Sequence, residues 1–274
     1  MKLVAVDGPP GETGTAVDRI ADRLAAEGTV AVVTEADDPG GTTTDDSGAA
    51  SRYVVGDGRV EGKEPGDVAT VLDRLAPEHD YAVLEGFPDA NAPRVRVGGE
   101  RAETDDERVV AAPARAEALD VERVVEALAG ARPRETLESL VAAVKRSPNA
   151  DRAGAIATFT GRVRTRDGPN DPPTEYLEFE AHDELAERRM VDLRSDLETR
   201  DGVWAVRLHH RRGVVEAGED IVFVVVLAGH RSAAFRAVED GIDRLKAEVP
   251  LFKREVTAEG EFWAHQHDPR EHDR

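Results

Sequence analysis

The first half of the sequence alternates short apolar runs with helical patterns, and this alternation restricts the fold it can adopt. The apolar run Leu3–Val6 precedes a segment with Val17, Ile20 and Leu24 on one helical face, and a second apolar run follows at Val30–Val33. Apolar positions three and four residues apart predict an amphipathic helix, and the flanking apolar runs predict strands. Together they predict a βαβ unit and therefore an α/β domain.

Later segments of the first half extend this α/β pattern. The stretch Glu35–Ser51 is rich in Asp, Gly and Thr without periodicity, which predicts a loop. After it we expect a hairpin turning at Asp57–Gly58, helices at Val68–Leu75 and Val121–Leu128, and strands at Tyr81–Gly86, Arg94–Val97 and Val109–Ala112. The stretch Gly130–Glu135 is the candidate linker, so the first domain is expected at residues 1–130.

The second half, expected as a separate domain at residues 134–274, has a different pattern. The continuous apolar run Asp220–Gly229 predicts a fully buried strand, and a helix ending before Pro250 follows it. That helix is predicted from the spacing of Phe235, Val238, Ile242, Leu245 and Val249. The other expected elements are helices at 137–145 and around 185–197, and strands at 155–164, 176–181 and 203–210. This is an α+β pattern in which helices cover one face of a mixed sheet.

The charge balance excludes two classes of partner. The chain has 36 basic and 56 acidic residues, a formal net charge of −20, and its acidic residues are spread through both halves. Such a solvated acidic surface repels nucleic acid and anionic membranes, so neither is expected as a partner. Only five of the basic residues are lysines, and an acid-rich, lysine-poor chain suggests a host with a high-salt cytoplasm.

The chain contains no cysteine. This excludes disulfides, thiolate metal sites and a protein-bound persulfide. The sequence also shows neither a signal peptide nor an apolar run of membrane length, so a cytoplasmic location is expected.

Two of the five lysines lie within one short stretch, LKAEVPLFKRE (Leu245–Glu255). Lys246 falls in the last turn of the predicted helix, and Lys253 lies just beyond it with Arg254 next to it. One interpretation is that cations here complement the helix dipole. The other is that two ammonium groups flank a pocket for an anionic substrate, where adjacent cations and partial burial lower a lysine pKa enough for proton exchange at neutral pH.

Other basic side chains could add to such a pocket. His230 and Arg231 stand at the start of the same predicted helix, and Arg164 stands at the end of the first strand of this half. For His230 the alternative is a capping or surface histidine.

Three ordered blocks now give a specific resemblance. TFTGRVR (Thr158–Arg164), GHRSAAF (Gly229–Phe235) and LKAEVPLFKRE resemble the large, catalytic subunit of molybdopterin synthase, the MoaE family, over roughly Glu135 to His265. The resemblance implies that a small ubiquitin-like sulfur carrier inserts its C-terminal Gly-Gly thiocarboxylate into a pocket. Two such sulfurs are transferred to cyclic pyranopterin monophosphate to make the dithiolene of molybdopterin. The absence of cysteine agrees with sulfur that arrives on a partner.

The resemblance also implies roles for single residues. Lys246 corresponds to the lysine beside the incoming thiocarboxylate and is the expected general acid/base, and Lys253 corresponds to a second active-site lysine that contacts substrate. Phe159 and Arg164 match the aromatic residue and the arginine of the first block, and Arg254 is expected on the substrate side beside Lys253. Sulfur transfer by this route requires no cofactor.

The resemblance implies a homodimer through the second domain, and a heterotetramer once two carriers bind. In such dimers the pair His230 and Arg231 can serve the neighbouring subunit's pocket and bind the phosphate. After Trp263 the family often has a basic residue, whereas this chain reads AHQHD, so His267 is a substitute for that charge. His265 and His267 could also suggest a metal site, but an exposed tail is the simpler interpretation and no metal is expected.

The stretch GPPGETGT (Gly8–Thr15) stands where a phosphate-binding loop would lie, between the first strand and helix. Against the Walker pattern G-x-x-x-x-G-K-[ST], Gly8 and Thr15 fit, whereas Thr13 replaces the second glycine and Gly14 replaces the lysine. Gly11 adds to the glycine content of the loop and is counted with its candidate nucleotide-binding residues. The sequence therefore predicts a degenerate loop that still offers backbone donors at a helix N-terminus.

A strand-end carboxylate strengthens the comparison. Glu85 ends the strand before Gly86 and Phe87, and with the loop this block resembles the MobB-type molybdopterin-guanine dinucleotide biosynthesis adaptor, a GTP-binding P-loop family, over roughly residues 1–112. The resemblance implies GTP and Mg²⁺ as ligands with Glu85 near the metal, although Gly14 in the lysine position argues against them. The alternative is that Glu85 simply faces solvent.

The leading hypothesis is a two-domain fusion whose second domain is the sulfur-transferring subunit. The alternative is a non-catalytic adaptor that binds GTP or molybdopterin for guanylation or delivery of the cofactor. Lys246 and Lys253 favour the sulfurtransferase over the adaptor. A third hypothesis, an active P-loop GTPase, is disfavoured because Gly14 stands where the lysine should be.

Overall fold

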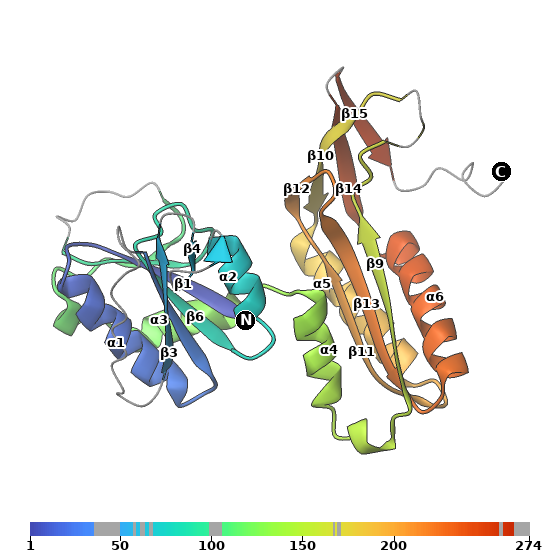
Figure 1. The fold of residues 1–274 in the computed structure, drawn as a ribbon, viewed down its shortest axis with the longest axis horizontal. Helices are drawn as coiled ribbons and strands as arrows, with labels where there is room; N and C mark the ends of the chain where they lie inside the picture. Colours follow the sequence, from blue (N-terminus) through green and yellow to red (C-terminus); the bar gives the residue numbers. More distant parts are fainter. Residues whose placement is uncertain are drawn as a thin grey trace. The chain divides into compact units, whose positions relative to one another are not determined.

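The computed structural model divides the chain into two compact units, Met1–Ser139 and Leu140–Arg274 (Figure 1). The division falls inside α4 (Leu137–Lys145), beyond the linker predicted at Gly130–Glu135. The residues that the structure describes are 1–35, 50–56, 59–60, 64–65, 68–98, 106–166, 168, 171–257 and 260–265.

The predicted β-α-β segment of the first unit is present as β1 (Lys2–Asp7), α1 (Glu12–Ala25) and β2 (Val30–Glu35). A later strand, β6 (Tyr81–Glu85), lies between β1 and β2 and pairs in parallel with both. Their carboxyl ends, and the loops that follow them, therefore meet at one edge of the sheet.

The sheet of the first unit has the order β5-β4-β3-β2-β6-β1-β7-β8 among the described strands. Its remaining strands are β3 (Ala50–Gly56), β4 (Arg59–Val60), β5 (Glu64–Pro65), β7 (Arg94–Arg96) and β8 (Val109–Ala111). Pairing is parallel from β3 to β8 and antiparallel at β4 and β5. Val55 pairs with Val60 on either side of the predicted hairpin turn, whose two residues lie outside the described part.

Helices cover both faces of this sheet, because residues alternate between two cores along its strands. One core joins Val4, Val32 and Val83 to α1 and to α3 (Val121–Gly130). The other joins the neighbouring positions Ala5 and Leu84 to α2 (Val68–Leu75). The unit is therefore a three-layer α/β sandwich, with the short helix η1 (Ala116–Ala118) packed in the first core.

The second unit contains two sheets among its described residues, so the prediction of a single mixed sheet is wrong. Their orders are β11-β13-β9 and β12-β10-β14-β15, and every neighbouring pair is antiparallel. The strands are β9 (Ala155–Arg162), β10 (Thr174–Ala181), β11 (Val203–His210), β12 (Gly213–Glu216), β13 (Asp220–Ala228), β14 (Leu251–Thr257) and β15 (Gly260–His265). Periodicity located most of these strands but carries no information on their partners.

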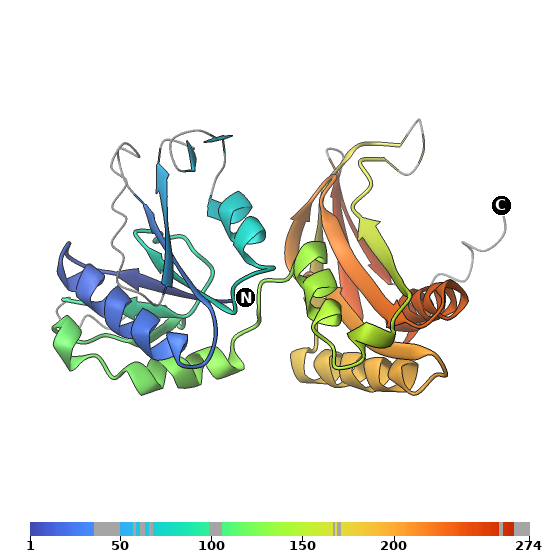
Figure 2. The same cartoon turned by 60° about the horizontal axis from the view of Figure 1, so that its bottom comes forward.

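The predicted buried strand and the helix after it form the centre of this unit. β13 is buried from Ile221 to Ala228, and α6 (Arg231–Glu248) lies along β13 and β9 (Figures 1 and 2). A Cβ on Gly241 would lie 3.1 Å from Val224 Cγ1, so this glycine lets helix and strand approach closely. The helix α5 (Asp183–Glu198) packs against β11 and α6 and completes the core.

One expected core residue of α6 is exposed. Phe235 was predicted on the apolar face, but its side chain is 64% exposed, because the buried stripe begins one residue earlier at Ala234 and continues through Ala237 and Gly241. The buried face of this helix consists largely of small residues, and a search for large apolar residues at helical spacing does not find such a face. Within the described residues no helix is both long and apolar enough to span a bilayer.

Candidate functional site

The end of α6 and the start of β14 bring two lysines to the same end of the second unit. Lys246 occupies the last turn of α6 with an exposed side chain, and no ion pair or hydrogen bond of its amine is recorded within the described part of the chain. The helix ends at Glu248, Val249 N–H donates to the carbonyl of Leu245 at 3.1 Å, and β14 starts at Leu251. The short turn thus places Lys253, on β14, close after Lys246 in the fold.

Lys253 and Arg254 face opposite sides of β14, because side chains alternate along a strand. The Lys253 amine lies 3.9 Å from the carboxylate of Glu255 on its own side. Arg254 pairs with Glu178 on the adjacent strand β10, and its Nε donates to Glu178 Oε2 at 2.9 Å. Both side chains are therefore half-buried and paired with a carboxylate, and the pair of Lys253 is the looser one.

The block TFTGRVR runs along β9 and just past its end. Phe159 is half-buried against the core of the unit, and Arg164 is exposed two residues after the strand. Gly161 is required between them, because a Cβ there would lie 2.6 Å from Val222 Cγ1. The backbone before Arg164 is fixed by two hydrogen bonds at 2.9 Å, from Val163 N to Glu219 O and from Gly218 N to Val163 O.

His230 and Arg231 lie at the opposite end of α6 from Lys246. His230 is the N-cap residue of the helix, makes no side-chain cap hydrogen bond, and is exposed, as is Arg231. Lys246 comes sixteen positions after His230, which corresponds to about 24 Å along the helix axis. One copy of the chain therefore does not bring this pair to the lysines. His267 lies outside the described residues.

Two adjacent histidines of β11 are held in the neutral form. Burial, reinforced by neighbouring positive groups, lowers the pKa of His209 to about 4. Burial also lowers the pKa of His210 to about 4, although its Nδ1 donates to the carbonyl of Arg211 at 2.6 Å. The rings pack on aromatic side chains of the core, His209 on Phe223 and His210 on Phe179. Sequence reasoning did not single out either histidine.

The loop Gly8–Thr15 joins β1 to α1 at the carboxyl end of the parallel strands. Gly11 has φ +91°, which favours glycine. The N–H groups of Glu12 and Thr13 both donate to the carbonyl of Pro9 at 3.2 Å, and the hydroxyl of Thr15 donates to the carbonyl of Gly11 at 3.0 Å. Several donors that a phosphate would need are therefore used within the loop.

Glu85 lies against this loop. Its carboxylate accepts a hydrogen bond from the Thr34 hydroxyl at 3.2 Å, and a Cβ on Gly14 would stand 3.9 Å from Glu85 Oε1. The side chain is half-buried at the end of β6. The position that holds lysine in a Walker loop is thus glycine here and faces a carboxylate.

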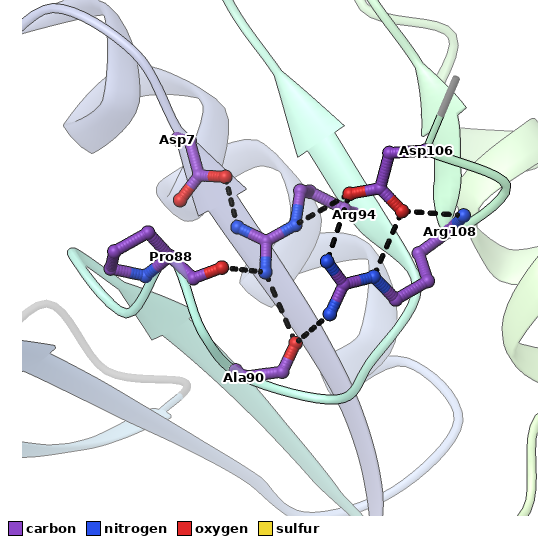
Figure 3. A network of polar contacts seen from close by, with 6 residues as sticks. All are labelled: Asp7, Pro88, Ala90, Arg94, Asp106 and Arg108. Carbon is purple, nitrogen blue, oxygen red and sulfur yellow. Dashed lines mark hydrogen bonds and ion pairs between the residues drawn. The ribbon is translucent and has the colours of Figure 1, made fainter. Parts of the chain in front are cut away.

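A buried arginine fixes the chain just before the loop (Figure 3). Arg94, on β7, is 1% exposed and pairs with Asp7, the last residue of β1. Its other partners are the carbonyls of Pro88, at 2.6 Å, and Ala90, at 3.1 Å, and its Nε lies 4.0 Å from Asp106. Hydrogen bonds from Arg108 lower the pKa of Asp106 to about 2. The periodicity of the sequence placed Arg94 in a strand but gave no sign of this network.

No group of three or more His, Asp or Glu side chains that could hold a metal ion occurs in the part of the chain that the structure describes. The side chain of His265 lies outside that part, so its pairing with His267 is not described.

Comparison with known proteins covers both units. Residues 133–248 match the family described as MoaE protein. A "Probable molybdopterin synthase" of Haloferax volcanii is 48% identical over 259 residues, which cover 93% of this chain and 98% of that protein. The molybdopterin synthase catalytic subunit of Pyrococcus abyssi is 42% identical over 110 residues, covering 40% of this chain and 73% of its own length.

Among solved structures, the chain is similar to the molybdopterin synthase of Staphylococcus aureus, with 30% identity and a TM-score of 0.42 over 48% of this chain and 92% of that one. The identity and coverage of the Haloferax volcanii and Pyrococcus abyssi proteins establish the family of the chain. The chain belongs to the family of molybdopterin synthase catalytic subunits, the MoaE family, and is a sulfurtransferase of molybdenum cofactor biosynthesis.

Proposed function

We propose that the second unit transfers sulfur from the C-terminal Gly-Gly thiocarboxylate of a small ubiquitin-like carrier to cyclic pyranopterin monophosphate, giving the dithiolene of molybdopterin. The observation that carries this proposal is the exposed Lys246 at the end of α6, followed closely by Lys253 on β14. Thiocarboxylate and phosphate are both anions, and a chain of net charge −20 needs a local concentration of cations to hold them.

In the proposed reaction, each thiocarboxylate sulfur forms a bond to a carbon of the substrate and an oxygen leaves that carbon. One oxygen stays on the phosphate as the cyclic ester opens, and the other takes up protons and leaves as water. A second water then cleaves each acyl–sulfur bond, so that sulfur stays on the substrate and the carrier leaves as a carboxylate. Lys246 moves the protons of these steps, because an exposed amine can approach both reactants. Lys253 binds substrate together with Phe159 and Arg164, and His267 supplies charge from the tail. Arg254 faces the other side of β14 and contributes to substrate binding by exchanging Glu178 for the substrate anion. No cofactor takes part.

We further propose that the second unit forms a homodimer in which His230 and Arg231 complete the pocket of the neighbouring copy and bind the phosphate. The separation of about 24 Å along α6 supports this, because the pair does not reach the lysines of its own chain. The exposed side chains of Phe235 and Ile156, on α6 and β9, supply apolar surface for such contact. With one carrier on each copy the assembly is a heterotetramer.

Replacement of Lys246 tests the proposal directly. We expect Lys246→Ala to abolish formation of molybdopterin from the precursor and the thiocarboxylated carrier, because the proton carrier is removed. The matched control is Lys145→Ala, an exposed lysine of α4 in the same unit. Turnover near wild type in Lys246→Ala would remove this lysine from the mechanism.

For the first unit we propose a degenerate nucleotide-binding domain of the MobB type. Support comes from the loop Gly8–Thr15 at the carboxyl end of β1 and from Glu85 beside it. Two features weaken any site for GTP with Mg²⁺. Glycine stands in the lysine position at Gly14, and several N–H groups of the loop already donate to carbonyls of the same loop. This unit is therefore proposed to retain the architecture of a phosphate loop without its main charge.

A further inference from the structure

A polar cavity of about 540 Å³ lies at the outer edge of the β11-β13-β9 sheet, and neither Lys246 nor Lys253 lines it. It is formed where the turn after α4 and the end of α5 meet β11. The side chains that carry the argument come from these three elements and are Arg146, Arg194, Glu198, Trp204 and Arg207. Three guanidinium groups thus gather around one cavity of a chain whose net charge is −20.

The single carboxylate of this set is already in use. Glu198 accepts a hydrogen bond from the backbone N–H of Val206 at 2.8 Å and lies 3.7 Å from Arg207 Nη1. Arg207 Nη1 in turn donates to the carbonyl of Val206 at 2.8 Å. Glu198 is therefore held by β11 and by Arg207, and it is the one acidic side chain that lines this cavity.

Two buried donors beside the cavity have no acceptor. Arg194 Nε and Trp204 Nε1 are inaccessible to solvent and make no hydrogen bond within the described residues. Buried N–H groups are nearly always paired in folded proteins, so a rotation of the Arg194 side chain toward an anion in the cavity would give an unpaired donor its acceptor. The guanidinium of Arg152 also lies 4.3 Å from the centre of the Trp204 ring, so a further positive charge stacks on a side chain that lines the cavity.

We propose that this cavity binds a small phosphate-bearing anion. A guanidinium group pairs with phosphate through two parallel hydrogen bonds. Three guanidinium groups therefore suit a phosphate ligand, which has several oxygens, better than a ligand with a single carboxylate. The volume lies within the range of small-molecule sites, roughly 300 to 1,000 Å³. Its β11 residues pair with the last residues of β13, directly before α6 begins, whereas Lys246 lies at the far end of that helix. The cavity is therefore remote from Lys246 and Lys253 of the same chain, although Trp204 lies close to Gly229, directly before His230.

Calorimetric titration of the full-length chain tests the proposal. Pyrophosphate and guanosine monophosphate are the two probes, because they distinguish an inorganic from an organic source of phosphate. We expect saturable binding of at least one probe with one site per chain. Arg194→Gln should weaken this binding roughly tenfold or more, since a charge-assisted hydrogen bond is lost. The matched control is Arg189→Gln, an exposed arginine of the same helix that does not line the cavity.

Absence of saturable binding of both probes at millimolar concentration would overturn the proposal, as would equal affinities of Arg194→Gln and Arg189→Gln. If Arg194→Gln lowers the thermal midpoint of unfolding, Arg146→Gln gives the same comparison at an exposed turn residue. Quenching of Trp204 fluorescence by the probe, measured in a Trp263→Phe background, reports binding at this cavity, because the chain has only two tryptophans. None of these binding measurements depends on Lys246. The anion-binding proposal can therefore fail while the proposal of sulfur transfer stands.

Discussion

The start of α1 and the end of α6 are both helix termini beside strands, yet they carry opposite local charge. At α1 the helix dipole favours an anion, but Gly14 stands in the lysine position and Glu85 faces it. At α6 the dipole disfavours an anion, but Lys246 and Lys253 reverse the local charge. A loop that lies where a phosphate-binding loop would lie is therefore not by itself an anion site. The charged side chains at each helix terminus decide whether an anion can bind.

Mixing two inactive variants tests whether the two ends of α6 serve pockets of different copies in a homodimer. We expect Lys246→Ala and Arg231→Ala to be inactive alone, because each damages every pocket of a homodimer. After mixing and subunit exchange, half of the dimers contain one of each chain, and each of these has one intact pocket. Activity should therefore return to about a quarter of the wild-type value in a two-fold symmetric dimer.

The control is each variant mixed with itself under the same exchange conditions. No recovery in the mixed sample, with subunit exchange shown by a tag on one chain, would mean that Arg231 serves its own chain or none.

Acid sensitivity is expected to differ between the two units. The pKa values of His209 and His210 are lowered to about 4 in the folded chain, below the ordinary value of about 6.5 for the unfolded chain. Their contribution to stability is therefore complete above about pH 6.5 and is lost as the pH falls toward 4, on the order of 3 kcal/mol for each histidine. Chemical denaturation at a series of pH values measures this slope for the second unit.

Replacement of one of these two histidines checks the cause. His209→Phe should reduce the dependence of the free energy of unfolding on pH, whereas His182→Phe, at an exposed histidine, should leave it unchanged. An equal slope in both variants would locate the acid sensitivity elsewhere.

The smallest expected effect is a gain of binding at the α1 loop. Gly14→Lys should bind GTP with Mg²⁺ roughly tenfold more tightly than the wild type, because it supplies the charge that the loop lacks. The substitution fits, since the new Cβ would be in ordinary contact with Glu85 at 3.9 Å. Gly130→Lys is the control, because it adds the same charge to the same unit at a position with open space. Equal GTP affinity of the two variants in calorimetry would show that the loop has lost more than its lysine.

Local patterns predicted much of the fold because they reflect contacts near in sequence. The helix at Leu137–Lys145 has the predicted bounds, and the apolar run in β13 is buried as expected. The separation of the second unit into two antiparallel sheets was missed, because β14 pairs with β10, which precedes it by more than seventy residues. Phe235 was placed in the core because its size was counted, whereas Ala234, Ala237 and Gly241 set the contact.

The candidate sites were predicted unevenly for the same reason. Ordered blocks such as LKAEVPLFKRE identified Lys246 and Lys253 by resemblance, and the structure shows how a tight turn brings their elements together. No sequence pattern singled out Arg94 or Arg194, because their neighbours come from elements distant in the sequence. Buried or unpaired polar groups of this kind become visible only once the chain is folded.

A structure of the chain in complex with the carrier tests the central claim most directly. The account predicts that the Gly-Gly tail ends within hydrogen-bond reach of the Lys246 amine, about 3 Å from its terminal carboxyl group or thiocarboxylate. A tail that ends away from Lys246 and Lys253, for example at the Gly8–Thr15 loop, would contradict it.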